Sequence, residues 1–215
     1  MKANSERVKG KNFRPLAGKP LFAWILDTLL SIDEIDAVVI NTDARHILAE
    51  NGLTDSDRVV IRDRRPEICG DMISMNKVLE DDVAAVSAET YLMTHTTNPL
   101  LGANTIRAAL QKYRSCDCDS LFTVNRVQTR FYRENMSAVN HDPNFLLRTQ
   151  DLEPWFEENS CLYIFSGESF RKAEARIGKK PVMFATPKLE SVDIDTPDDW
   201  AIAEALALHH LKCTV

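Results

Sequence analysis

The sequence has no long hydrophobic run among its 215 residues. No apolar stretch approaches the roughly 20 residues that a membrane-spanning helix needs. The basic residues near the N-terminus are also not followed by the apolar core of a signal peptide. From these two absences we expect a cytoplasmic protein that has no membrane partner.

The sequence also lacks the repeated cysteine pairs of a zinc site. Its five cysteines are scattered, and Cys116 and Cys118 form a CxC motif with no second pair downstream. An odd number of scattered cysteines is typical of proteins from a reducing compartment. The GxGxxG, P-loop, GxSxG and HExxH motifs are all absent, so a dinucleotide-binding fold, a P-loop enzyme, a serine hydrolase and a zinc hydrolase have no support.

Positive charge is concentrated at one end of an acidic chain. The net charge is -6, but residues 1–19 carry +5 and the remainder carries -11. The acidic balance argues against nucleic acid as the main partner. A basic, glycine-containing loop on an acidic body suits a polyanionic ligand such as a triphosphate. A solvated basic tail is the alternative. Asn12, Pro15 and the sequence Gly18-Lys19-Pro20, which would end the loop, count against it.

Helical and strand patterns alternate along most of the chain and predict an α/β fold, a mostly parallel sheet with helices on both faces. The length suits one domain, residues 1–215. Ligands of such sheets bind beyond the carboxyl ends of the strands. We expect helices at Pro20–Ile32, Ala44–Asn51, Ser74–Glu89, Asn104–Arg114, Glu168–Ile177 and Thr196–Leu211. We expect strands at Ala37–Thr42, Arg58–Arg62, Tyr91–Thr94, Ser120–Asn125, Ser160–Phe165 and Val182–Thr186.

One segment, residues 126–155, interrupts this alternation. It is polar and aromatic and has no long periodic run. Because a structureless loop of that length is uncommon in a compact domain, we expect a projecting β-hairpin or small subdomain. Such an insertion would cover the site or pack on a second subunit.

Two carboxylates near the C-terminus form a candidate metal site. In the segment Ser191–Trp200, strand alternation would put Asp193 and Asp195 on one face, where they could hold Mg²⁺. Helix capping is the alternative interpretation of this segment. It accounts for Thr196 through Asp199, but it does not account for Asp193 and Asp195.

Two other polar stretches are less informative by themselves. Arg64 and Arg65 begin a loop that leads to Ser74, and we interpret Ser74 as a helix N-cap. His95 follows a predicted strand, but no partner close in sequence would make it catalytic. A structural role is the simpler interpretation of both stretches.

Taken in order, several motifs resemble the sugar-acid cytidylyltransferases, in particular the acylneuraminate (CMP-sialic acid) synthetases. The resemblance covers the whole chain. The matching segments are AnSeRVkGKNfrpLaGKPL at residues 3–21, NTD at 41–43, RPEicgD at 65–71, TTNPL at 96–100, RTQDLEPwfEENSclYIF at 148–165 and SVDIDTPDDW at 191–200.

The resemblance implies a three-layer Rossmann-like fold and a reaction in which CTP and a sugar acid give a CMP-sugar and pyrophosphate, with Mg²⁺ as cofactor. It also implies a homodimer, built in part by residues 126–155. The implied catalytic residues are Lys11 and Asp195, and the implied metal ligands are Asp193 and Asp195. The implied nucleotide-binding residues are Lys2, Asn4, Ser5, Arg7, Lys11, Asn12, Arg65 and Ser74. The implied sugar-binding residues are His95, Arg148, Gln150 and Tyr163.

The chain departs from the family pattern in three places. Many sialic acid synthetases have Gln where this chain has His95, and Arg where it has Leu101, so a related nonulosonic acid is as credible a substrate as N-acetylneuraminate. Relatives also have an apolar strand directly ahead of the position of Lys2, and here Met1 stands at that junction. Two alternatives therefore stay open: a 3-deoxy-manno-octulosonate cytidylyltransferase, and a truncated, non-catalytic nucleotide-binding homologue.

Overall fold

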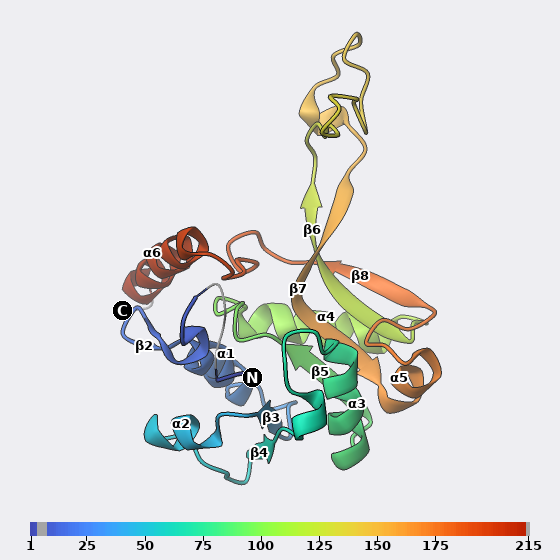
Figure 1. Cartoon of the computed structure of the whole chain (residues 1–215). Coiled ribbons are helices and arrows are strands. Elements are labelled where there is room, and N and C mark those ends of the chain that lie inside the picture. Colours follow the sequence, from blue (N-terminus) through green and yellow to red (C-terminus); the bar gives the residue numbers. More distant parts are fainter. Residues whose placement is uncertain (4–7, 214–215) are drawn as a thin grey trace.

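The computed structural model describes residues 1–3 and 8–213. Helices and strands alternate in it nearly as the sequence predicts (Figure 1). The α-helices are α1 (Leu21–Leu30), α2 (Arg45–Glu50), α3 (Met75–Ala85), α4 (Ala103–Ser115), α5 (Gly167–Ala173) and α6 (Pro197–Cys213). The strands are β1 (Pro15–Leu16), β2 (Lys19–Pro20), β3 (Val38–Thr42), β4 (Val59–Asp63), β5 (Thr90–Thr94), β6 (Ser120–Val127), β7 (Trp155–Ser166) and β8 (Pro181–Ala185). Short 3-10 helices are η1 (Lys11–Phe13), η2 (Pro66–Ile68) and η3 (Thr149–Asp151).

The main sheet has the strand order β5-β7-β6-β8. Strand β7 runs antiparallel to both of its neighbours, and β6 and β8 are parallel. Three of these four strands therefore run in one direction, and β3 and β4 form a separate parallel pair. The predicted α/β fold with a mostly parallel sheet is confirmed, with β7 as the reversed strand.

Strand β7 has a core on each face, because its side chains alternate. Leu162 and Ile164 pack with α1 and α4 on one face. Tyr163 and Phe165 pack with α3 and α5 on the other face. The sheet is therefore the middle of three layers, as expected from a central strand that is apolar on both sides.

The basic N-terminal loop packs against the rest of the protein from Val8 onward. Val8 and Leu16 are buried in a cluster with Trp24 of α1 and Trp200 of α6. The guanidinium carbon of Arg14 lies 4.4 Å from the ring centroid of Trp200, a cation–π distance. These contacts rule out a solvated tail for this part of the loop.

The facing edges of β3 and β5 have no strand partner within the described residues, because β3 pairs only with β4 and β5 only with β7. The backbone amine of Met1 donates to the carbonyl of Asn41 on β3, so the chain begins against one of these edges.

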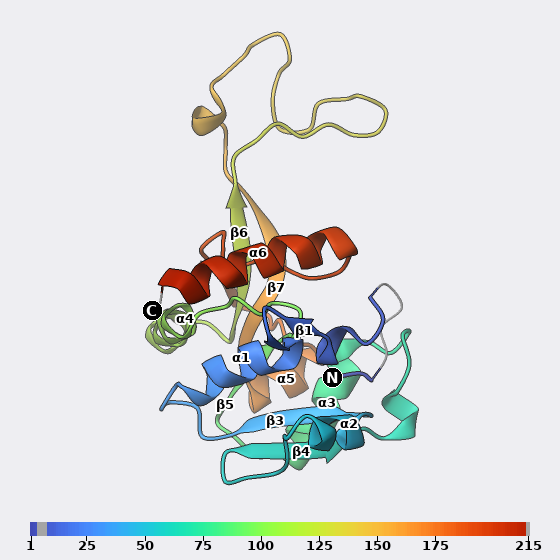
Figure 2. The ribbon, with the colours of Figure 1, turned by 90° about the vertical axis from the view of Figure 1, so that its left-hand side faces the viewer.

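Residues 128–154 form an arm that extends β6 and β7 away from the other layers, as Figures 1 and 2 both show. The antiparallel part of β6 and β7 forms its base, and the tip holds only isolated bridges and η3. The predicted projection is therefore present. Its hairpin character is limited to the base.

Three local predictions were wrong. The helix expected to reach Glu89 ends at Ala85, since the hydroxyl of Tyr91 donates to the carbonyl of Val86 and fixes an extended turn there. The helix expected to reach Ile177 ends at Ala173, because Glu174 adopts a left-handed conformation. The strand expected around Asp193 is not formed: this segment pairs with no strand in the described part of the chain.

The sulfurs of Cys116 and Cys118 are bonded to each other, a pairing that the sequence analysis did not predict. Among the helices described, none has the length and apolar character required to cross a membrane.

Candidate functional site

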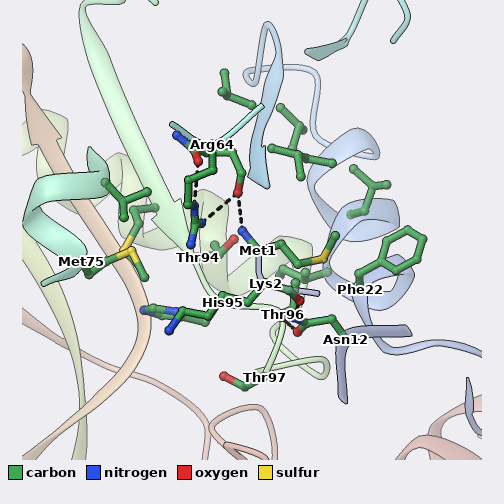
Figure 3. A pocket seen from close by; sticks show the side chains of 18 of the residues that line it. Met1, Lys2, Asn12, Phe22, Arg64, Met75, Thr94, His95, Thr96 and Thr97 are labelled. Carbon is green, nitrogen blue, oxygen red and sulfur yellow. Dashed lines mark hydrogen bonds between the residues drawn. The ribbon is translucent and has the colours of Figure 1, made fainter. Parts of the chain in front are cut away.

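A groove of about 520 Å³ lies between β3, β5 and the N-terminal segment (Figure 3). It runs along β3 from Val38 to Asn41, and its other wall includes the end of β5 and residues 95–97, where a ligand of an α/β protein is expected. Its polar lining includes Lys2, Lys11, Asn12, Asn41, Arg64, Asp71 and residues 94–97. Its apolar lining comes mainly from α1, β3 and α3.

Lys11 connects the N-terminal loop with the C-terminal acidic segment. Its ammonium is buried, donates to the carbonyl of Ile194 at 2.6 Å and forms an ion pair with Asp195 Oδ1 at 3.2 Å. Gly10, at a φ of 62°, provides the left-handed turn that begins η1 and directs Lys11 inward. The structure thus brings together the two predicted catalytic residues.

Asn12 joins the loop to the end of β5. Its side-chain amide donates to the carbonyl of Lys2 at 2.8 Å and accepts from the hydroxyl of Thr96 at 2.6 Å. The Lys2 ammonium is held by Asp71 at 2.7 Å. Lys2, Lys11 and Asn12 therefore surround one end of the groove, as predicted. Three further predicted residues, Asn4, Ser5 and Arg7, lie outside the described residues.

Asp193 and Asp195 flank the buried side chain of Ile194. Burial raises the pKa of Asp193, and the negative charge of Asp195 acts in the same direction. Asp193 Oδ1 is buried and accepts no hydrogen bond from the described residues. A carboxylate oxygen in that state suits a cation, and a pair of carboxylates suits Mg²⁺, which takes its other ligands from phosphate and water. No group of three or more His, Cys, Asp or Glu in the described ranges could hold a metal by itself.

Thr196 caps α6, as the capping interpretation predicts, and Asp199 in the first turn is its reciprocal partner. Its carboxylate accepts from the backbone N–H groups of Asp195 at 3.1 Å and of Thr196 at 2.7 Å. The Asp199 N–H in turn donates to the Thr196 hydroxyl at 3.3 Å. This reciprocal cap fixes the end of the acidic segment beside Lys11.

Two predicted nucleotide-binding residues do not line the groove. Arg65 is mostly exposed and pairs with Asp81 at 2.8 Å. Ser74 caps α3, accepting from the N–H of Asn76. Arg64, which was named with Arg65 but given no ligand-binding role, is buried and donates to Asn41 Oδ1 at 2.9 Å and Asn41 O at 3.0 Å. Its place immediately after β4 was the signal that could have identified it.

The predicted sugar-binding residues lie in two different places. His95 lines the groove, and Tyr163 lies completely buried behind it, with its hydroxyl donating to Glu158. Arg148 and Gln150 belong to the arm, where Arg148 pairs with Asp151 at 2.6 Å and the Gln150 carbonyl accepts from Gln128 at 3.2 Å. Neither arm residue lines the groove of its own chain.

The environment of His95 keeps the imidazole neutral. Burial, together with the positive charge of Arg176, lowers the pKa of His95 to about 4. Burial also raises the pKa of the Tyr163 hydroxyl to about 12. Both side chains are therefore uncharged at neutral pH, and the local charges are those of Lys11, Arg176 and the carboxylates.

The fold is that of an α/β protein with a groove beside the sheet, the place where ligands of such folds bind. The chain belongs to the cytidylyltransferase family, whose model matches residues 1–213.

Two curated relatives and one solved structure are among the proteins similar to this chain. An N-acylneuraminate cytidylyltransferase of Streptococcus agalactiae is 25% identical over 93% of this chain, and the chain spans only 50% of its length. A pseudaminic acid cytidylyltransferase of Campylobacter jejuni is 21% identical over 95% of this chain and 92% of its own. A solved CMP:2-keto-3-deoxy-manno-octonic acid synthetase complexed with CTP has a similar fold, with a TM-score of 0.68 at 14% identity over 98% of this chain and 96% of its own.

The low pKa of His95 predicts a specific loss of stability in acid. As the pH falls from about 6.5 to 4, the unfolded chain takes up a proton on this residue and the folded chain does not, so the folded state loses stability. Replacing His95 with Gln removes this contribution, and the loss between pH 7 and 4.5 should shrink by as much as about 3 kcal/mol. Urea unfolding at both pH values measures the difference. His46→Gln, at an exposed site on α2, is the matched control. If wild type and His95→Gln lose stability in parallel, the assigned state of His95 is wrong.

Proposed function

We propose that this chain transfers CMP from CTP to a sialic-type nonulosonic acid and releases pyrophosphate. The observation that carries the proposal is the contact of Lys11, a lining residue of the groove, with Ile194 and Asp195, because it joins the cationic loop to the acidic segment that holds Asp193 and Asp195. Family membership supports the use of CTP. The named sialic and pseudaminic acid relatives support the substrate class. CTP as substrate and the composition of the chain favour a cytoplasmic location.

The chain's own residues would act mainly by positioning and by charge. Lys11 and the loop amides neutralise negative charge on the triphosphate, and Asn12 orders the loop through Lys2 and Thr96. The anomeric hydroxyl of the sugar attacks the α-phosphorus in line with the departing pyrophosphate. Such a transfer depends on alignment and electrostatic stabilisation more than on covalent catalysis.

Mg²⁺ is the cofactor that we propose for this site. Asp193 and Asp195 would hold it, since Asp193 Oδ1 is buried without a protein donor. When bound, such an ion neutralises phosphate charge and lowers the pKa of a nearby hydroxyl. Asp199 accepts from the backbone N–H of Asp195 and so fixes the chain at that residue.

Two alternatives have support of different kinds. A 3-deoxy-manno-octulosonate substrate is favoured by the fold of the solved synthetase, but the segment TQDLEPWFEENS at residues 149–160 favours the sialic-type branch. A non-catalytic nucleotide-binding role is favoured by the edges of β3 and β5 beside the groove, which have no strand partner in the part of the chain that the structure describes. Binding of CTP without turnover on any sugar acid would support this second alternative.

Replacing Lys11 with Ala or Asp195 with Asn tests the proposal. Each substitution removes one charged group from the site, and the rate should fall on the order of 10²–10³-fold. Pyrophosphate release from CTP and a panel of sugar acids is the measurement. Lys9→Ala and Asp198→Asn are the matched controls, because both side chains are exposed. Near-normal turnover in either site variant would refute the assignment.

We also propose that the chain forms a homodimer through the arm, as an insertion at about residues 126–155 in a single nucleotidyltransferase domain. The arm and its base expose several apolar side chains, and a second copy is the partner that would bury them. Arg148 and Gln150 could then reach the groove of the partner subunit. The exposed apolar residues are Tyr132, Met136, Phe145, Leu146, Leu147, Trp155 and Phe156.

Replacing both Phe145 and Leu146 with Ser should convert the dimer into a monomer. Phe145 and Leu146 are 68% and 76% exposed, so the change should not disturb the folded chain. Sedimentation velocity measures the mass, and the variant should also lose activity if the arm completes the partner's site. Leu189→Ser, at an apolar position outside the arm that is 64% exposed, is the control. A monomeric wild type, or a variant that stays dimeric, contradicts the proposal.

A further inference from the structure

Arg176 is a cation beside the groove to which the sequence analysis gave no role. It lies between α5 and β8, and its backbone N–H donates to the side chain of Asn76 on α3 at 3.3 Å. Its guanidinium carbon stacks 3.7 Å from the ring centroid of Tyr163. The side chain is 21% exposed, so a fixed, mostly buried cation lies immediately behind His95.

The polar contacts of the guanidinium are long. It lies 3.5 Å from His95 Nε2, 3.5 Å from Glu158 Oε1 and 3.7 Å from the sulfur of Met93. A charge-assisted hydrogen bond to a carboxylate is normally about 2.7–2.9 Å. The same Glu158 oxygen also accepts from the buried Tyr163 hydroxyl. The planar fork of Arg176 is therefore held in place by stacking, and its hydrogen-bonding capacity is poorly used.

The positions of the two cations divide the site into two parts. The charges of both Arg176 and Lys11 act on His95, which lies in the groove lining and is neutral at neutral pH. Lys11 faces the carboxylate pair and would serve the triphosphate. Arg176 lies 3.5 Å from His95 Nε2 and outside the lining of the groove, and its guanidinium is suited to a second anionic group that reaches past His95.

We propose that Arg176 is a specificity residue that binds the carboxylate of the sugar acid. This inference rests on the proposed function, because a sugar acid carries one carboxylate in addition to its hydroxyls. A guanidinium binds a carboxylate through two parallel N–H···O bonds, which a lysine ammonium cannot reproduce. Stacking on Tyr163 fixes the plane of the guanidinium for this contact.

The test separates binding of the carboxylate from a structural role. Arg176→Gln and Arg176→Lys should each raise the KM for the sugar acid about 10–10²-fold and leave the KM for CTP unchanged, since one charge-assisted contact is lost. The methyl ester of the same sugar acid should be a poor substrate for wild type. The Arg176→Gln variant should discriminate much less between acid and ester. Arg171→Gln, an exposed arginine on α5, is the control.

The outcomes distinguish this inference from the proposed function. If wild type releases pyrophosphate with a sugar acid and Arg176→Gln retains the wild-type preference for acid over ester, Arg176 does not bind the carboxylate. A rise in the KM for CTP together with a lower Tm would assign Arg176 a structural role and also overturn the inference. If wild type turns over no sugar acid at all, the proposed function itself is wrong, and the inference about Arg176 is overturned with it.

Discussion

The contact of the Lys11 ammonium with the Ile194 carbonyl and the Asp195 carboxylate is the constraint on which the site depends. A buried cation is costly unless it is paired and hydrogen-bonded, so these acceptors fix where the basic loop can lie. The loop brings Asn12 to the end of β5 and Lys2 to the edge of the groove. The cap at Asp199 fixes the other side of the same contact. Positive charge, carboxylates and groove are therefore arranged by one interaction between the two ends of the chain.

The separate halves of this arrangement could be predicted from the sequence, but their contact could not be derived from local patterns. Apolar periodicity located α1, β3 and α4 to within a few residues. Charge alone identified the loop, and strand alternation drew attention to Asp193 and Asp195. Lys11 and Asp195 are 184 positions apart, and no local spacing rule joins them. Only the resemblance to a family put them in one site.

The wrong or incomplete predictions have physical causes of their own. Arg64 and Arg65 are adjacent in the sequence and chemically equivalent. In the structure Arg65 forms an ion pair with Asp81 on α3, whereas Arg64 is hydrogen-bonded to Asn41 and is buried. The family resemblance implies that Tyr163 binds the sugar. Alternation along β7 instead buries it, so that it supports Arg176. Arg176 itself belongs to no motif, because its place depends on stacking between elements that are far apart in the chain.

The most direct test of this account is a crystal structure of the chain with a non-hydrolysable CTP analogue and Mn²⁺. The account predicts an anomalous Mn²⁺ peak in contact with Asp193 and Asp195. It also predicts that the triphosphate lies against the Lys11 ammonium at the same end of the groove. A nucleotide bound elsewhere, or a triphosphate that approaches neither Lys11 nor the two carboxylates, would contradict it.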